Sequence, residues 1–483
     1  MDTVLSPAGV GEYSAADMPA SIEMSRRLRD TGVSAGDRVM LKADNSVALA
    51  VVLFALIHLD VSLVLVDHQQ TVAESRRVIE LAKVEWALLG EDIPAPSGVR
   101  VIRFERLLEG KAPAGSGADA LDLGGWRRRR DALITWSSGS TGRPKGVVRT
   151  GEAFLGNIER TGKAMGYRPT DMFLPLLPFS HQYGLSLLFL ALLSGAGVLV
   201  GPYRRLGVVL RAAQRATVLD ATPATHRSLV SLLERRPELA ERLRSVRLYC
   251  TGGAPMDARF SERFREVLGH PLLDGYGSTE LGNVALATPE TPVGCGHALD
   301  GIKLGILRED GRAAPAGEVG EVVVSSPDMM AGYLTADGTV DPAPPPPYRT
   351  RDLGYLDDRG HLFVLGRKQA VHRLGHTLYP EALERRAEAI GRAVAVVPLD
   401  DERRGCTLIF AVEDPEPGAE DARTWRRRIG AHLAPYEQPD QVVVLDRFPV
   451  NRNGKTDRTE LHRICREAVF GPPASAAGGD SRA

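Results

Sequence analysis

Strands and helices alternate through the first part of the chain, and this alternation restricts the possible folds more than any other feature. Residues 21–33 (SIEMSRRLRDTGV) have the apolar spacing of a helix, and residues 37–43 (DRVMLKA) have the character of a strand. A buried helix is predicted over 46–60 and a buried strand over 61–67. Such alternation builds βαβ units, whose parallel sheets are covered by helices.

The rest of the chain repeats this pattern, interrupts it and then returns to it. A strand, a helix and a second strand are predicted over 132–138, 152–166 and 171–178. After residue 300, short strands with Gly and Asp turns indicate a more antiparallel, β-rich part. Helices and strands alternate again from residue 381. We therefore predict an α/β protein. It should have a large N-terminal domain of parallel-rich sheets with helices plus a β-rich subdomain (1–366), a small mobile α+β C-terminal domain (367–470) and a disordered tail (471–483).

Composition narrows the function classes. The net charge of -1, with 43% hydrophobic and 25% charged residues, is that of an ordinary globular protein and argues against nucleic-acid or membrane-surface partners. The four cysteines are widely spaced without a CxxC pair, which argues against a zinc site or a disulfide scaffold. Neither a signal peptide nor a membrane span is evident, because the most apolar stretches (48–60 and 185–201) contain polar residues or glycine. We expect a cytoplasmic protein.

A Ser/Gly-rich loop with a lysine interrupts the predicted sheet at 135–148 (TWSSGSTGRPKGVV). It follows an apolar strand and precedes a helix, an arrangement in which backbone N–H groups can surround an anion. It is not a Walker A loop, because the four residues that follow Gly139 lead to Pro144 and not to a Gly-Lys pair, and Gly142 is followed directly by Arg143. Taken alone it could be a simple connector. As a phosphate site it would use Ser137, Ser138, Gly139, Ser140, Thr141, Gly142 and Lys145.

Further motifs follow in a fixed order, and together they carry a family resemblance. They are LPFSHQYGL (177–185), YCTGGAP (249–255), DGYGSTELG (274–282), YRTRDLG (348–354) and PVNRNGKTDR (449–458). With SSGSTGRPKG they make the chain resemble the adenylate-forming superfamily of acyl-CoA synthetases, peptide-synthetase adenylation domains and luciferases. The resemblance runs from about 25 to about 465, and the motif style is closest to acyl- and aryl-acid CoA ligases.

The resemblance implies a nucleotide site, and the residue chemistry agrees with it. Glu280 is the expected Mg²⁺ ligand, because a carboxylate beside a triphosphate needs a cation between them. Asp274 could accept from the adenine amino group, Tyr276 could stack on the base, and small residues let the backbone approach. The adenine and phosphate set is Gly252, Gly253, Ala254, Asp274, Gly275, Tyr276, Gly277, Ser278 and Thr279, and the ribose set is Asp352 and Arg367. Singly, each residue could instead be a surface, core or turn residue.

Two further residues are implied in catalysis. Lys455 lies in a polar turn, where it could be a solvated loop lysine; the resemblance implies that a mobile small domain inserts it between the acid carboxylate and the ATP α-phosphate, orienting both anions. His181 could be a core histidine, and the resemblance implies that it steers the carboxylate of the acid. The expected catalytic set is therefore Lys455, Thr279, Glu280 and His181.

The resemblance implies that a carboxylic acid reacts with MgATP to give acyl-AMP and pyrophosphate, after which CoA or a carrier protein's phosphopantetheine takes the acyl group. The hinge GRKQAVHRLG lacks the family's acidic residue and has Lys368 and Gln369 where the pivot should be, although Gly375 matches the glycine of the thiol tunnel. Two alternatives remain. The adenylate could pass to a non-thiol, such as a nitrogen nucleophile, or the chain could be an inactive nucleotide-binding scaffold.

Overall fold

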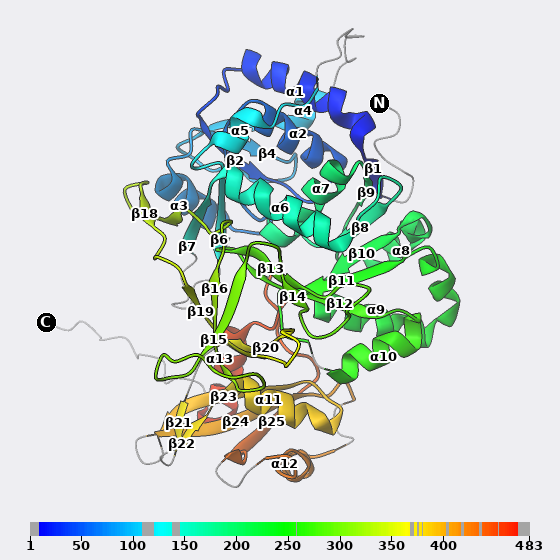
Figure 1. The fold of residues 1–483 in the computed structure, drawn as a ribbon, viewed down its shortest axis with the longest axis vertical. Coiled ribbons are helices and arrows are strands. Elements are labelled where there is room, and N and C mark those ends of the chain that lie inside the picture. Colours follow the sequence, from blue (N-terminus) through cyan, green and yellow to red (C-terminus); the bar gives the residue numbers. More distant parts are fainter. Residues whose placement is uncertain are drawn as a thin grey trace, which may run out of the picture. The chain divides into compact units, whose positions relative to one another are not determined.

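The computed structural model describes residues 9–108, 120–137, 145–256, 258–367, 371–373, 376–378, 380–401, 405–416, 420–433, 437–452 and 454–471. The chain divides into two compact units (Figure 1). The first contains the residues up to Thr350 together with Tyr355–Val364, and the second contains Arg351–Gly354 and the residues from Leu365 onward.

The first large sheet has eight strands around a parallel centre. Its central strands β9, β8, β10, β11 and β12 are parallel, and β1, β13 and β14 pair antiparallel at its edges. In spatial order the strands are β1 (Gly11–Tyr13), β9 (Gly197–Val200), β8 (Met172–Leu176), β10 (Val218–Ala221), β11 (Leu248–Gly252), β12 (Leu272–Ser278), β13 (Gly282–Leu286) and β14 (His297–Ala298).

The second large sheet has the same design. Strands β6, β3, β2, β4 and β5 are parallel, and β7, β17 and β18 continue the sheet in antiparallel pairs. In order they are β18 (Val340–Pro342), β17 (Gly332–Leu334), β7 (Lys145–Arg149), β6 (Leu133–Ser137), β3 (Ser62–Leu65), β2 (Arg38–Lys42), β4 (Trp86–Leu89) and β5 (Arg100–Arg103).

Helices fill the space between the two large sheets and cover their outer faces. The largest apolar cluster joins the inner faces of both sheets to α1 (Met18–Asp30), α2 (Val47–His58), α6 (Gly151–Met165) and α7 (Gln182–Ser194). Helix α2 is buried on nearly all sides, as a helix between two sheets must be. The outer face of the first sheet carries α8 (Leu206–Ala212), α9 (Pro223–Arg235) and α10 (Ala258–Leu268), and that of the second carries α3 (Val72–Ala82) (Figure 1).

Short helices complete the first unit, and a smaller sheet lies mostly within it, although Arg351–Gly354 and the residues from Leu365 onward belong to the second unit. The short helices are α4 (Phe104–Leu108), α5 (Gly124–Arg128), η1 (Ala15–Asp17), η2 (Ala213–Arg215) and η3 (Pro237–Leu243). A four-stranded sheet has the order β15 (Lys303–Leu307), β16 (Gly320–Ser325), β19 (Tyr348–Leu356) and β20 (Leu362–Arg367). The β-rich part expected after residue 300 is therefore present.

The second unit is a small α+β fold. Its main sheet pairs β23 (Val394–Asp401) antiparallel with β24 (Gly405–Glu413), which pairs parallel with β25 (Gln441–Leu445). One face packs against α11 (Pro380–Ala387) and α12 (Ala422–Gly430), and the other against α13 (Arg458–Phe470). A hairpin of β21 (Val371–Arg373) and β22 (His376–Leu378) and the turn η4 (Glu388–Ile390) complete it.

The predicted fold class is confirmed: an α/β part with parallel-centred sheets precedes a small α+β part. Among the helices that the structure describes, none reaches the length and apolar character that crossing a bilayer requires.

Candidate active site

The predicted phosphate loop joins β6 to β7, so the expectation that it directly precedes a helix is wrong: a strand follows the loop, and α6 begins only at Gly151. Ser137 ends β6, Lys145 begins β7, and the two are register partners. Ser138, Gly139, Ser140, Thr141 and Gly142 lie outside the described residues. The Lys145 Nζ atom lies 5.0 Å from the centroid of the Tyr333 ring, a cation–π distance.

Tyr333 also contacts the candidate metal ligand. Its hydroxyl donates to Glu280 Oε1 at 3.2 Å and lies 3.1 Å from the hydroxyl of Tyr348. Glu280 is buried, and its backbone oxygen accepts from Met330 N at 2.7 Å. One phenol therefore brings together the end of the phosphate loop and Glu280. The sequence analysis did not predict a role for Tyr333. This residue lies in the segment MMAGYL (329–334), and only the position of that segment between the recognised motifs could have indicated it.

The β12–β13 hairpin, which carries Ser278, Thr279 and Glu280, is fixed by a close turn. Gly282 has φ +73°, and a Cβ there would lie 2.4 Å from Asn157 Oδ1. A Cβ at Gly277 would lie 2.4 Å from the Gly282 carbonyl oxygen. The hydroxyl of Ser278 is buried without a hydrogen-bond partner in the described part of the chain. An unpartnered donor beside Glu280 fits a site for a phosphate oxygen.

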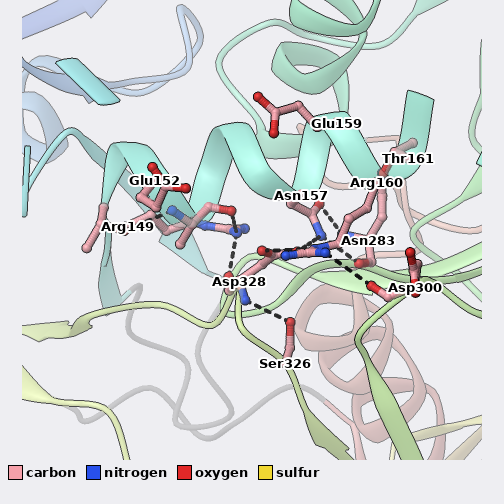
Figure 2. A network of polar contacts seen from close by, with 12 residues as sticks. Arg149, Glu152, Asn157, Glu159, Arg160, Thr161, Asn283, Asp300, Ser326 and Asp328 are labelled. Carbon is pink, nitrogen blue, oxygen red and sulfur yellow. Dashed lines mark hydrogen bonds and ion pairs between the residues drawn. The ribbon is translucent and has the colours of Figure 1, made fainter. Parts of the chain in front are cut away.

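A buried polar network holds this hairpin against α6 (Figure 2). The Asn157 amide accepts from Asn283 N and donates to Asn283 O, both at 2.8 Å. It also donates to Asp328 Oδ2 at 3.2 Å, and Arg160 Nε donates to the same oxygen at 3.1 Å. Because Asn157 makes hydrogen bonds with both the backbone N–H and the backbone carbonyl of Asn283, strand β13, which follows Glu280, is fixed to α6.

Arg149 is a second residue that sequence reasoning missed. Its side chain is fully buried at the end of β7, and Nη2 donates to the Asp328 backbone oxygen at 2.7 Å (Figure 2). Burial lowers the pKa of Arg149 to about 10, although the negative charges of Asp328 and Glu280 oppose this shift. The guanidinium therefore stays charged at neutral pH, close enough to Glu280 to offset part of its charge.

The glycines predicted to lie at adenine form the end of β11. A Cβ at Gly252 would lie 3.0 Å from Gly275 O and 3.4 Å from the Tyr183 ring, so no larger side chain fits without a shift of neighbouring atoms. Gly253 has φ +81°, and Ala254 follows it. Gly252 is thus packed closely against β12 and Tyr183, and the exposed Gly253 follows at the carboxyl end of β11, where ligands bind in parallel α/β sheets.

The predicted adenine partners are more buried than expected. Burial raises the pKa of Asp274 to about 7, opposed by a hydrogen bond of 3.4 Å from Cys295 Sγ. The Tyr276 side chain is buried in an apolar cluster with Leu281 and Val322. The adenine contacts of both residues remain a prediction.

His181 begins α7 and meets a carboxylate from the second large sheet. Its Nε2 lies 3.5 Å from Oδ2 of Asp67, which follows β3. Ser180 Oγ donates to the same oxygen at 3.1 Å. Asp67 is the third residue that sequence reasoning missed, and only its place at the end of a predicted parallel strand marked it.

Three predicted residues belong to the second unit. Asp352 is buried in β19, and Arg367 ends β20. Lys455 is exposed in a turn closed by an antiparallel bridge between Val450 and Thr456, and its backbone N–H donates to Asn451 Oδ1 at 3.1 Å. This turn presents the lysine to solvent, as a residue that acts on a ligand requires.

Metal ligands are sparse. Within the described ranges, no three His, Cys, Asp or Glu side chains gather closely enough to hold a metal ion. Glu280 is thus a single candidate ligand. Such a site suits Mg²⁺, which commonly takes one or two carboxylates together with phosphate oxygens and water.

Two parallel-centred sheets, with glycines at the carboxyl ends of β11 and β12, followed by a small α+β unit, are the arrangement that the family resemblance led us to expect of an adenylate-forming enzyme. The chain belongs to the AMP-binding enzyme family, whose model matches residues 20–334, and the C-terminal domain model of the same enzymes matches 390–455. The superfamily and ligase class predicted from the motifs are thereby confirmed.

Individual relatives agree over nearly the whole chain. A 2-succinylbenzoate–CoA ligase of Bacillus pumilus is 29% identical over 456 residues, which cover 91% of this chain and 90% of the relative. The Bacillus subtilis o-succinylbenzoate CoA synthetase MenE, solved with its acyl-adenylate, has a TM-score of 0.78 at 25% identity and covers 92% and 91%. ATP-bound MatB from Rhodopseudomonas palustris has a TM-score of 0.83 at 23% identity, covers 93% of each chain and shows likeness of fold.

Proposed function

We propose that this enzyme activates a small carboxylic acid with ATP and transfers the acyl group to the thiol of CoA. The observation that carries the proposal is the convergence of Lys145 and Glu280 on Tyr333, beside a Ser278 hydroxyl that has no hydrogen-bond partner among the described residues. A lysine, a hydroxyl and a carboxylate that can hold a cation are together the groups that a triphosphate needs. CoA is favoured as the thiol because relatives that match this chain over nine tenths of their length are CoA ligases.

The reaction has two balanced steps. A carboxylate oxygen of the acid attacks the α-phosphorus of ATP, the bond from that phosphorus to the bridging oxygen breaks, and pyrophosphate leaves. The thiol sulfur, after losing its proton, then attacks the acyl carbon, and AMP leaves with the electrons of the C–O bond. The aryl acid in the relatives' names, a succinylbenzoate, makes an aryl or short acyl acid the proposed substrate class.

Each candidate residue has a role in this scheme. Lys145, Ser278 and the loop from Ser137 to Gly142 hold the phosphates, and Thr279 and Glu280 hold the phosphate and its Mg²⁺, which supplies charge neutralisation when bound. Gly252–Ala254 and Asp274–Gly277 hold adenine, while Asp352 and Arg367 hold the ribose. His181 steers the acid, and Lys455 bridges the two reacting anions.

The small unit is proposed to act as a lid between the two steps. We place the boundary of the large domain at 366, where the hinge begins. Lys368, Gln369 and Gly375 lie outside the described residues. The hinge lacks the family's acidic residue, so transfer to a nitrogen nucleophile is the second candidate function.

The test is pyrophosphate release over a panel of aryl and short acyl acids. We expect release only when ATP, Mg²⁺ and an acid are all present, with an acyl-CoA product when CoA is added. Cleavage of ATP to ADP and phosphate would contradict the adenylation scheme. Acid-dependent pyrophosphate release that yields no thioester, but yields an amide when amines are supplied, would favour the second candidate.

Asp352→Ala should raise the KM for ATP about 10- to 150-fold, because two ribose hydroxyls would lose a charged acceptor worth roughly 1.5 to 3 kcal/mol. The KM for the acid should change little. Asp352→Asn keeps the size of this buried side chain and therefore controls for a folding defect. Asp358→Ala is a second control, which removes an exposed aspartate of the same β-rich segment. An unchanged KM for ATP in both Asp352 variants would place the ribose elsewhere.

A further inference from the structure

The loops at the carboxyl edges of the two large sheets are joined by side chains from both. Asn45, after β2, donates from Nδ2 to Leu177 O at 2.8 Å and accepts at Oδ1 from Phe179 N at 2.9 Å. Asp67, after β3, accepts from Ser180 Oγ. The segment that leads into α7 and ends at His181 is therefore anchored by the second sheet.

Asp67 is a buried anion. Its Oδ1 accepts from Gln69 N at 2.9 Å, and Oδ2 takes the contacts with Ser180 and His181. Burial alone would raise the pKa of Asp67, but His181, the Gln69 N–H and the charge of His68 outweigh it and lower the pKa to about 2. Asp67 therefore carries its charge throughout the range in which the enzyme would work.

The contact with Asp67 orients the imidazole of His181. Nε2 is buried and lies at an ion-pair distance of 3.5 Å from Asp67 Oδ2 without a hydrogen bond to any described residue, while the His181 side chain keeps 31% exposure. The accessible surface therefore belongs to the rest of the ring, which leaves Nδ1 as the nitrogen that can meet a ligand. His181 makes no side-chain cap to α7, so the helix does not compete for the ring.

Other charges near this pair come from the neighbouring loops. His68 Nδ1 lies 3.8 Å from Asp67 Oδ1 and 3.9 Å from Oδ1 of Asp44, which is half exposed. After β9, the Arg204 guanidinium lies 5.4 Å from the centroid of the Tyr203 ring. Burial raises the pKa of Tyr203 to about 12; Arg204 opposes this shift, and the charges of Asp67 and Asp44 add to it.

We propose that Asp67 is a positioning residue, which holds His181 by Nε2 so that Nδ1 faces the carboxylate of the acid substrate. The inference rests on the proposed function, because it needs an acid for His181 to meet. A tether for the loop alone would not need a charge, since an uncharged amide could accept from Gln69 N at its oxygen and donate to Ser180 Oγ, whose hydroxyl can also accept. The negative charge of Asp67 therefore matters only for its contacts with His181 and His68. Of these two residues, His181 is the one to which the family resemblance assigns a role in acid binding.

The test is a double-mutant cycle with Asp67→Asn and His181→Ala, read by pyrophosphate release. Asp67→Asn should raise the KM for the acid about tenfold, because it removes the negative charge that faces the imidazole at 3.5 Å, and leave the KM for ATP unchanged. In the His181→Ala background the same change should have no further effect, because Asp67 acts through that ring. Ser180→Ala and Asp44→Asn are the matched controls, and each should change the KM for the acid less than threefold.

A second measurement does not depend on activity. In protein labelled with ¹⁵N-histidine, the His181 ring nitrogens should shift in Asp67→Asn and stay in place in Asp44→Asn. Equal effects of Asp67→Asn with and without His181, or an unmoved His181 signal, would overturn the positioning role. A parent protein without acid-dependent release would remove the proposed function and with it the acid-binding role, even if the histidine signal responds to Asp67.

Discussion

Lys455→Ala is expected to lower the rate of acyl-adenylate formation by a factor of about 10² to 10³, the usual loss for one preorganised donor at a developing anion. The protein should fold normally, because the Lys455 side chain is exposed and the turn around it is closed by backbone groups. Thiol transfer from supplied acyl-AMP should survive, since the proposed rotation of the small unit between the steps would carry this lysine away from the site.

The measurement feeds ATP and acid, and separately synthetic acyl-AMP and CoA, to the variant and the parent. Arg447→Ala removes another exposed cation of the same unit and should change neither rate. Equal loss of both half-reactions would mean that Lys455 is not specific to adenylation, and loss of neither would end its assignment. A parent that forms the adenylate but transfers poorly to every thiol would point to the altered hinge or to a non-thiol acceptor.

The second large effect is expected at Glu280. Glu280→Gln should lower kcat/KM for pyrophosphate release by about 10²-fold, because the metal loses its charged protein ligand. The Mg²⁺ concentration for half-maximal rate should rise as well. Glutamine keeps the size of this buried side chain and can still accept from the Tyr333 hydroxyl, so the thermal melting temperature should change little.

Tyr333→Phe is the matched control for Glu280. It removes the hydrogen bond of 3.2 Å and keeps the carboxylate, so activity should fall only a few-fold and the Mg²⁺ dependence should stay that of the parent. If Glu280→Gln leaves the Mg²⁺ dependence unchanged, the metal is bound by other groups.

Much of the fold could be predicted because the relevant signals are local. The alternation over 21–67 specifies α1, β2, α2 and β3, since an apolar period and a turn residue are properties of neighbouring positions. The positive φ angles of Gly253 and Gly282 are local features as well, since glycine adopts them without strain, although the sequence analysis predicted no turn at either position.

The partners of the site residues could not be predicted in this way. Tyr333 is 53 positions from Glu280, and Asp67 is 113 positions from Ser180. These contacts arise where strand ends of different sheets meet, and no periodicity within one segment encodes them. The burial of Arg149 could not be predicted either, because an arginine in a strand is usually exposed unless a partner from another segment covers it.

The two halves of the candidate site are anchored by separate sets of side chains. Asn45 and Asp67 hold the start of α7, which carries His181, whereas Asn157 and Asp328 hold the hairpin that carries Glu280. Because the two sets share no residue, substitutions that retune the accepted acid need not disturb the nucleotide groups. Within one fold, the preference for an acid can therefore change without a change in the ATP chemistry. Directed evolution toward new acids should begin at the residues around the start of α7 and leave unchanged the polar network of Asn157 and Asp328 that holds the hairpin to α6.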